Sequence, residues 1–128
     1  LIPFVICFTI KNKIFSCSEG GQYRDFLYIS DAIKSIIKSL KNKKILGKVI
    51  NVGYGKPIEV KKIILQINNL INKGKPIFGK VNLRADESNI IYPNLTRSKK
   101  YLFLGKKKNI LDGLKETIKF YKKNINKY

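Results

Sequence analysis

The feature that most constrains the fold is an alternation of short runs of branched or aromatic residues with longer stretches whose apolar residues recur every three or four positions. Short apolar runs are typical of strands, and a spacing of three or four is typical of a helix with one side against a core. No internal repeat or long linker interrupts the alternation. It predicts one compact α/β unit, and 128 residues suffice for a single modest core.

Three stretches carry the helical spacing, with apolar residues at 33, 36, 37 and 40, at 60, 63, 64, 67 and 71, and at 111, 114, 118 and 121. Ser30 and Asp31 are expected to cap the first helix and Asn109 the third, while Gly74 and Pro76 end the second. The other predicted elements are a helix over 1–11, a short helix closed by Gly105, and strands over 14–17, 26–29, 49–52 and 77–81.

Lysine dominates the charge of the chain. The formal net charge is +19, but nearly half of the residues are Lys, Ile or Asn, and of the 27 basic residues only Arg24, Arg84 and Arg97 are arginines. The lysines are scattered through every predicted helix and loop and do not interleave with aromatic residues that could stack on bases. We interpret the charge as compositional drift, expect no nucleic-acid partner, and keep a stand-alone basic nucleic-acid-binding module as the alternative function.

The apolar opening LIPFVICFTI is about half as long as a membrane-spanning helix. It also lacks the basic region and the small-residue cleavage site of a signal peptide. We therefore expect a core helix, no membrane partner and a cytoplasmic protein. Because the chain begins at Leu1 and contains no methionine, we expect a fragment of a longer protein.

The sequence offers no catalytic or metal-binding constellation. It contains no histidine, and Cys7 and Cys17 lack the spacing of zinc ligands, so both are expected to be buried and inert. Residues 51–57, NVGYGKP, have the G-x-G of a phosphate loop, but Ile58 occupies the position of the third glycine. A plain strand-to-helix turn is the preferred interpretation.

Arginines are exceptional in a chain so rich in lysine, and the planar guanidinium binds phosphate oxygens through two parallel hydrogen bonds. Arg24 and Arg84 both flank turn-like segments. The structural alternative is an ion pair with a nearby carboxylate, Asp25 for Arg24 or Glu87 for Arg84. The residues alone leave both interpretations open.

Five segments in one order, QYRDFLYISD, KVINVGYGKPIEV, LRADE, SKKYLFLG and ILDGLKETIKFY, together cover nearly the whole chain. In order and spacing they resemble the C-terminal half of NAD-dependent NDP-sugar epimerases and dehydratases, the extended short-chain dehydrogenases. The resemblance implies the C-terminal part of a Rossmann-type dehydrogenase, in which short strands and amphipathic helices form the substrate lobe. One departure is Lys106 to Lys108, where the family often has Trp and Pro.

The resemblance also implies an NDP-sugar substrate and a role for six residues. Arg24 and Arg84 would reach the diphosphate, and Asn51 would help to hold the nucleotide. Glu87 would lie near the nucleotide or orient Arg84. Phe15 and Cys17 would lie on the strand that borders the base.

The family's glycine-rich NAD(P) loop and its Tyr-x-x-x-Lys pair precede this region, and neither occurs in this chain. We therefore assign no catalytic residue and expect NAD or NADP to be bound mainly by an N-terminal half that the chain lacks. This chain alone is expected to bind an NDP-sugar weakly or not at all, and a homodimer is expected of the complete enzyme only. A degenerate domain without a ligand is a further alternative.

Overall fold

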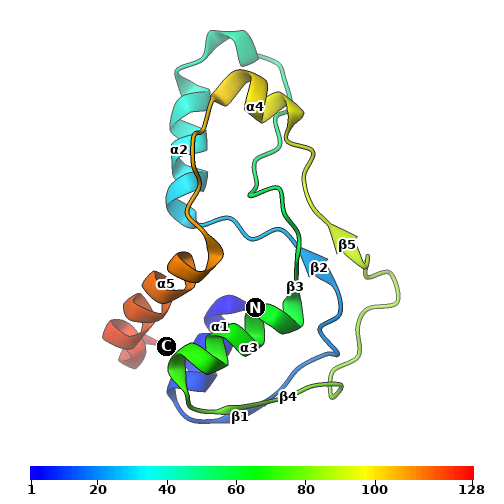
Figure 1. The fold of residues 1–128 in the computed structure, drawn as a ribbon, viewed down its shortest axis with the longest axis vertical. Helices are drawn as coiled ribbons and strands as arrows, with labels where there is room; N and C mark the ends of the chain where they lie inside the picture. The colour runs from blue at the N-terminus through cyan, green and yellow to red at the C-terminus, as the bar shows by residue number, and fades with distance from the viewer.

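The computed structural model describes residues 1–128 and has the α/β architecture that the sequence predicts (Figure 1). The helices are α1 (Ile2–Ile10), α2 (Ile29–Leu40), α3 (Val60–Ile71), α4 (Thr96–Leu102) and α5 (Ile110–Asn124), with short 3-10 helices η1 (Lys43–Ile45) and η2 (Ile125–Lys127). The strands are β1 (Ile14–Ser16), β2 (Tyr23–Arg24), β3 (Ile58–Glu59), β4 (Lys75–Ile77) and β5 (Ile90–Ile91). No helix is long and apolar enough to cross a membrane.

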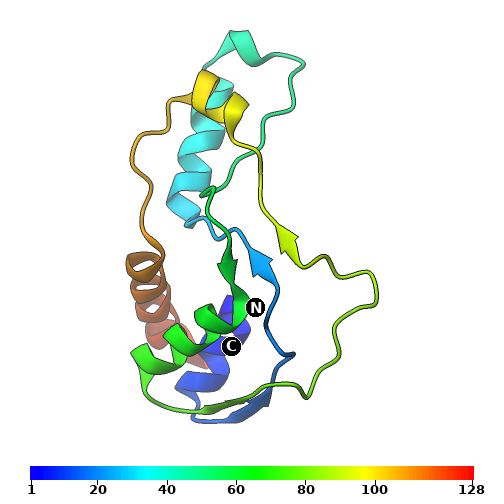
Figure 2. The same ribbon diagram turned by 45° about the vertical axis from the view of Figure 1, so that its right-hand side comes forward.

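The hydrophobic core lies where α1, α3 and α5 pack together at one end of the elongated molecule (Figures 1 and 2). Strands β1 and β4 pair in parallel beside these helices, with Phe15 opposite Pro76. The spacing of three and four in α3 turns all five of its stripe residues inward, as predicted. The buried core residues are Val5, Ile6, Phe15, Cys17, Val60, Ile63, Ile64, Ile67, Ile71, Leu114 and Ile118.

A three-stranded sheet in the order β3–β2–β5 occupies the middle of the molecule (Figure 2). Strand β2 is antiparallel to β3 and parallel to β5, so that Arg24 lies opposite both Ile58 and Ile91. The loop between β4 and β5 stands out from the rest of the chain in Figure 2. This sheet brings three distant segments of the sequence to one place.

Helices α2 and α4 pack against each other at the end opposite the core (Figure 1). Two hydrogen bonds cross this contact: Asn42, just beyond α2, donates to the carbonyl of Tyr101 (2.8 Å), and Lys38 donates to the carbonyl of Phe103 (2.5 Å). Asp31 and Ser35 are the buried residues of α2. The predicted apolar face of α2, at 33, 36, 37 and 40, is exposed to solvent.

Three of the predicted strands are wrong in place or absent. The strand expected over 26–29 lies earlier, at Tyr23–Arg24, because those residues find partners in β3 and β5, and α2 already begins at Ile29. The strand expected over 77–81 lies at Lys75–Ile77, where β1 supplies a partner. Residues 49–52 form no strand, since no neighbouring strand is present to pair with them.

The helix ends follow local chemistry only in part. The side chain of Asn109 accepts a hydrogen bond from the backbone N–H of Asp112, which confirms the predicted cap of α5. Neither Ser30 nor Asp31 caps α2, because both lie inside its first turn. The left-handed residues that end α3 and α4 are Asn72 (φ 55°) and Phe103 (φ 45°), and not Gly74 and Gly105.

The same substitution on α2 and α3 should have different effects on stability. Ile67 is fully buried, so Ile67→Ala should lower the free energy of unfolding by about 2–5 kcal/mol. Ile36 is 60% exposed, so Ile36→Ala should change it by less than about 0.5 kcal/mol. Urea unfolding followed by circular dichroism measures the free energy of unfolding of both variants. Equal losses of stability would contradict the burial of Ile67 in the core and the exposure of Ile36.

Candidate functional site

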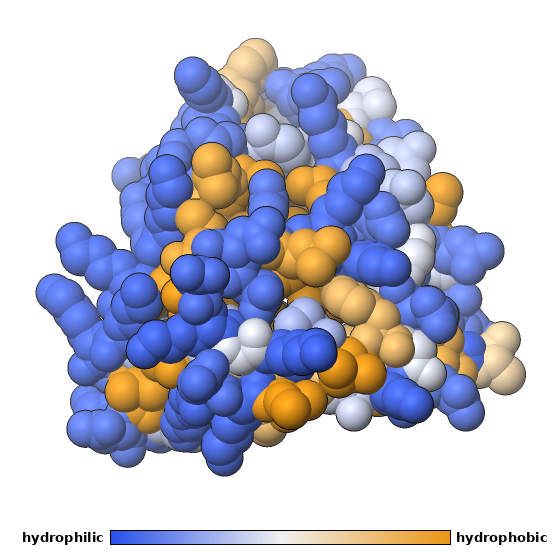
Figure 3. All heavy atoms as spheres, turned by 60° about the horizontal axis from the view of Figure 1, so that its bottom comes forward, coloured by the Kyte–Doolittle hydropathy of each residue, from blue (hydrophilic) through white to orange (hydrophobic).

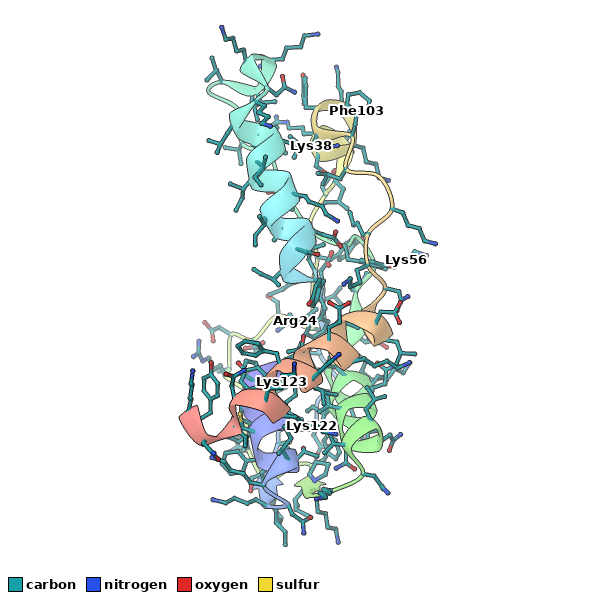
Figure 4. All side chains as sticks on the ribbon, turned by 90° about the vertical axis from the view of Figure 1, so that its left-hand side faces the viewer. Arg24, Lys38, Lys56, Phe103, Lys122 and Lys123 are labelled. Atoms are coloured by element: carbon teal, nitrogen blue, oxygen red, sulfur yellow. The ribbon has the colours of Figure 1, made fainter.

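The central sheet holds Arg24 in a fixed environment. Its guanidinium forms an ion pair with Glu87 and donates through Nη1 to the carbonyl oxygen of Tyr23 (2.7 Å). The two side chains are only 21% and 29% exposed. Since β5 follows soon after Glu87, the pairing of β2 with β5 brings this carboxylate to Arg24. Arg24 is labelled in Figure 4, near the middle of the molecule.

Arg84 and Glu87 lie in one turn, in which the N–H of Glu87 donates to the carbonyl of Arg84 (3.1 Å). Arg84 is exposed and forms no ion pair. Glu87 thus bridges Arg24 to the turn that carries Arg84, and the carboxylate pairs with Arg24. This pairing differs from both ion pairs that sequence proximity suggested, because strand pairing outweighs separation along the chain.

Asp25 ties the strand of Arg24 to the loop that follows Asn51. Its carboxylate accepts hydrogen bonds from the N–H groups of Tyr54 (2.8 Å) and Gly55 (2.6 Å). A β-carbon at Gly53 would lie 2.9 Å from the Asp25 carboxylate, so the close approach requires glycine. Sequence proximity suggests Asp25 only as an ion-pair partner for Arg24, and the structure gives its carboxylate this different role. The G-x-G of this loop was the available signal for a tight backbone contact.

Asn51 is exposed and precedes this clamped loop by two residues. With Val49, Asn94, Thr96 and Arg97 it lines a shallow depression of about 390 Å³. Arg97 donates to the carbonyl oxygen of Val49 (3.0 Å), so the third arginine holds the backbone near Asn51.

Phe15 and Cys17 lie in the hydrophobic core. Phe15 is 4% exposed and packs edge-on against Phe4, with ring centroids 5.8 Å apart. Cys17 is buried, which raises the pKa of its thiol. The carbonyl of Cys17 accepts from the N–H groups of Lys80 (3.0 Å) and Val81 (3.2 Å). These bonds anchor the start of the loop that leads to Arg84.

A second polar cluster joins the first turn of α2 to α5. Glu116 accepts from the hydroxyl of Tyr28 (2.7 Å) and from the ammonium of Lys108 (2.5 Å). The Lys108 ammonium also lies 4.4 Å from the centre of the Tyr28 ring. The hydrogen bond to Glu116 raises the pKa of Tyr28 and of Lys108 and lowers the pKa of Glu116. Tyr28 and Lys108 also line a cavity of about 370 Å³.

Asp31 belongs to the same cluster. It accepts from the backbone N–H of Lys108 (2.8 Å) and from the ammonium of Lys34 (3.1 Å). Burial by itself raises the pKa of Asp31, but the two hydrogen bonds outweigh burial and bring the pKa below its ordinary value of 3.8. The acidic residue that was expected to cap α2 thus fastens α2 to the start of α5.

The region contains two guanidinium groups and no cluster of metal-ligating side chains. No group of three or more His, Cys, Asp or Glu side chains could hold a metal ion, and both cysteines are free. Two guanidinium groups on neighbouring segments could together engage a diphosphate.

Comparison with known proteins gives the family. No family model matches the chain. A UDP-glucuronate 4-epimerase of Thermodesulfobacterium geofontis is 36% identical over 115 residues, which are 88% of this chain and 34% of that protein. A CDP-abequose synthase of Salmonella muenchen is 35% identical over 89 residues, which are 68% and 30% of the two chains.

This chain belongs to the extended short-chain dehydrogenase family of nucleotide-sugar epimerases and dehydratases, as a C-terminal part. The chain spans about a third of the length of these two relatives. An epimerase of the family from Methanothermobacter thermautotrophicus has a TM-score of 0.90 at 18% identity, covering 98% of this chain and 39% of that one.

A second solved neighbour in the family is the UDP-glucuronic acid 4-epimerase of Bacillus cereus in complex with UDP-glucuronic acid and NAD. Its TM-score is 0.85 at 24% identity, and the match covers 96% of this chain and 40% of that one. At these identities the two structures establish the fold, which confirms the predicted architecture.

The Asp31 cluster predicts a pH-dependent contribution to stability. Asp31→Ala leaves the N–H of Lys108 without its acceptor and should lower the free energy of unfolding by about 1–3 kcal/mol at neutral pH. The pKa of Asp31 is lower in the folded state, so its contribution is complete above the unfolded pKa and is lost as pH falls through the folded pKa.

Urea unfolding of both proteins from pH 7 to pH 2 measures the difference, and the two stability curves should converge at the acid end. Asp86→Ala is the matched control, because Asp86 is exposed and its side chain makes no hydrogen bond or ion pair. A gap between wild type and Asp31→Ala that persists at pH 2 would contradict this role.

Proposed function

We propose that this chain supplies the diphosphate-binding side of the nucleotide-sugar site in an NAD(P)-dependent epimerase, dehydratase or reductase, and is not catalytic by itself. Its relatives are nucleotide-sugar enzymes, and one solved neighbour contains both NAD and a UDP-sugar. The observation that carries the proposal is the joint placement of Arg24 and the Arg84 turn, linked through Glu87.

Arg24 is suited to this role because the residues around it limit its motion. Glu87 and the carbonyl of Tyr23 occupy part of its donor fork, and strand pairing on both sides limits movement of its backbone. A diphosphate would bring more negative charge than one carboxylate, so it can compete with Glu87 for the guanidinium. Arg84 has no such partner and is free to turn toward the same anion.

The other predicted site residues serve this geometry in different ways. Asn51 would contact the nucleotide from the segment that Asp25 clamps through Tyr54 and Gly55. Glu87 would orient Arg24 beside the nucleotide. Phe15 and Cys17, which are buried, would act by supporting the loop that leads to Arg84.

The redox step requires groups that this chain does not contain. In the proposed complete enzyme the N-terminal half would hold NAD(P), which would supply the hydride chemistry, and the family's Tyr-x-x-x-Lys pair would lie there as well. Homodimerisation and a cytoplasmic location are proposed for that complete enzyme as well. The net reaction would be an epimerisation, a dehydration or a reduction.

The test is calorimetry on a hybrid in which this chain follows the N-terminal two thirds of the Thermodesulfobacterium geofontis epimerase. Removing a charged donor should cost about 1.5–3 kcal/mol, so Arg24→Ala and Arg84→Ala should each weaken binding of UDP-, CDP- or dTDP-sugars about 10- to 150-fold. Lys123→Ala, which removes the same charge from the exposed side of α5 (Figure 4), should leave affinity unchanged.

Unchanged affinity in both arginine variants would contradict the assignment of the site. The nucleic-acid alternative has no supporting contact, and Figure 3 shows hydrophilic side chains spread over a whole face, with apolar patches between them. A gel shift of this chain with RNA or DNA that survives physiological salt would favour that alternative.

A further inference from the structure

The loop of residues 53–55, Gly-Tyr-Gly, has its peptide groups held from two sides. The N–H groups of Tyr54 and Gly55 donate to the Asp25 carboxylate, one to each oxygen. The carbonyl oxygens of Gly53 and Tyr54 accept from the ammonium of Lys107, at 2.5 Å and 3.1 Å. These four groups belong to only two consecutive peptide units. Each unit is therefore bonded at both its N–H and its C=O.

The charges of the two side chains match the polarity of these peptide units. A peptide unit is positive at its N–H and negative at its carbonyl oxygen. Here a carboxylate accepts from the two N–H groups, and an ammonium donates to the two carbonyl oxygens. Hydrogen bonds of this kind, with one charged partner, are stronger than those between neutral groups. No ion pair joins Asp25 to Lys107, so the loop supplies the hydrogen-bond partners of both charges.

The bonds to Asp25 also explain why the G-x-G of this loop is not a phosphate loop. Consecutive backbone N–H groups in a turn can form a concave site for an anion. Gly55 has a φ of 90°, which favours glycine and turns its N–H to the same side as that of Tyr54. The anion that these two groups bind is a carboxylate of the same chain. The loop thus holds one segment of the protein to another.

Lys107 belongs to the segment between α4 and α5, which runs along the length of the molecule (Figure 1). It is the middle one of the three lysines that stand where the family often has Trp and Pro. Lys106 is exposed, whereas Lys108 bonds to Glu116 and Lys107 bonds to the loop. An ammonium has three N–H donors, and Lys107 uses two of them on backbone carbonyls. This lysine is therefore a specific contact and not only a solvated surface charge.

The clamped loop lies between two parts of the candidate site. Asn51 precedes the loop by two residues, and β3 follows it, with Ile58 opposite Arg24. The backbone of residues 49–52 makes no backbone hydrogen bond, and its one other tie is the bond from Arg97 to the carbonyl of Val49. The position of Asn51 thus depends on the loop that Asp25 and Lys107 hold.

We propose that Lys107 is a positioning residue of the nucleotide site: with Asp25 it fixes the Gly-Tyr-Gly loop, and through the loop it holds Asn51 in place for the nucleotide. The proposal rests on the proposed function, because it takes Asn51 as a contact of the nucleotide. Both hydrogen bonds of the Lys107 ammonium go to the loop backbone. Lys107 therefore acts through Asn51 and not on the ligand itself.

The first measurement is hydrogen exchange in the hybrid that contains the N-terminal two thirds of the Thermodesulfobacterium geofontis epimerase. Lys107→Met keeps most of the side-chain length and removes the donors, and Lys106→Met makes the same change at the exposed neighbour. Without Lys107 the loop opens more often, so the amides of Tyr54 and Gly55 should exchange about tenfold faster, or faster still. The amides of α3 in Lys107→Met, and all amides in Lys106→Met, should exchange as in the unchanged hybrid.

The second measurement is calorimetry on the same proteins, with UDP-glucose, CDP-glucose and dTDP-glucose as probes. Lys107→Met should weaken binding about 3- to 30-fold, as is typical of a residue that acts through a coupled neighbour. Added to Asn51→Ala, it should weaken binding by less than about twofold more, because the contact through which it acts is already lost. A merely structural role would not produce this dependence on Asn51. Lys107→Arg, whose guanidinium can donate to both carbonyls, should restore the affinity and the slow exchange.

Three results would overturn the positioning role. Unchanged exchange at Tyr54 and Gly55 in Lys107→Met would show that the loop does not depend on Lys107. Faster exchange with unchanged affinity, or faster exchange throughout α3 as well, would leave Lys107 with a role in stability only. A full additional loss of affinity in the Asn51→Ala background would show that Lys107 acts on the ligand directly.

The arginine variants separate these results from a failure of the proposed function. If Arg24→Ala and Arg84→Ala weaken binding while Lys107→Met does not, only the positioning role is overturned. A hybrid that binds none of the three probes, or whose affinity neither arginine variant lowers, contradicts the proposed function. The positioning role then fails with it, whatever the exchange rates of the loop.

Discussion

The arrangement of the molecule depends on the pairing of Tyr23 and Arg24 with strands on both sides. These two residues connect β3 and β5, and through them the core end of the molecule to the end formed by α2 and α4. Asp25 continues the connection with two hydrogen bonds from the loop that precedes β3. Tyr23 and Arg24 thus set the position of the Arg24 side chain beside Glu87, and Asp25 fixes the backbone of the loop that follows Asn51.

The elements that could be predicted from sequence are those whose determinants are local. The α3 stripe and the Asn109 cap of α5 each depend on residues within one or two turns. The strands were harder, because a run of apolar residues becomes a strand only where a partner is available. Residues 26–29 and 49–52 have the composition of strands but no neighbouring strand to pair with. Tyr23 and Arg24 have a weaker strand pattern in their sequence, yet they pair with strands on both sides.

In the candidate site, too, features that depend on local sequence could be predicted, and features that depend on pairing between distant segments could not. The family resemblance predicts Arg24 and Arg84 as site residues, because a rare residue in a recognisable motif is visible in a single sequence. It could not identify the contact between Arg24 and Glu87 or the clamp from Asp25, since both arise from pairing between distant segments. The burial of Phe15 likewise depends on α1, whose position the sequence pattern did not give. Of the two cysteines expected to be buried, Cys17 is buried, whereas Cys7 is only partly buried.

The short central sheet also has a consequence for the order in which the chain folds. The α1–β1 and α3–β4 contacts lie close in the sequence, whereas the contacts of β2 with β3 and β5, like those of α1 with α3 and α5, join distant segments of the chain. Bringing distant segments together costs conformational entropy before their contacts stabilise the chain, so contacts between distant segments tend to form later than local ones. Arg24 and Glu87 are 63 residues apart, so they would meet only after the local α1–β1 and α3–β4 contacts have formed, and the candidate site would mature later than those contacts.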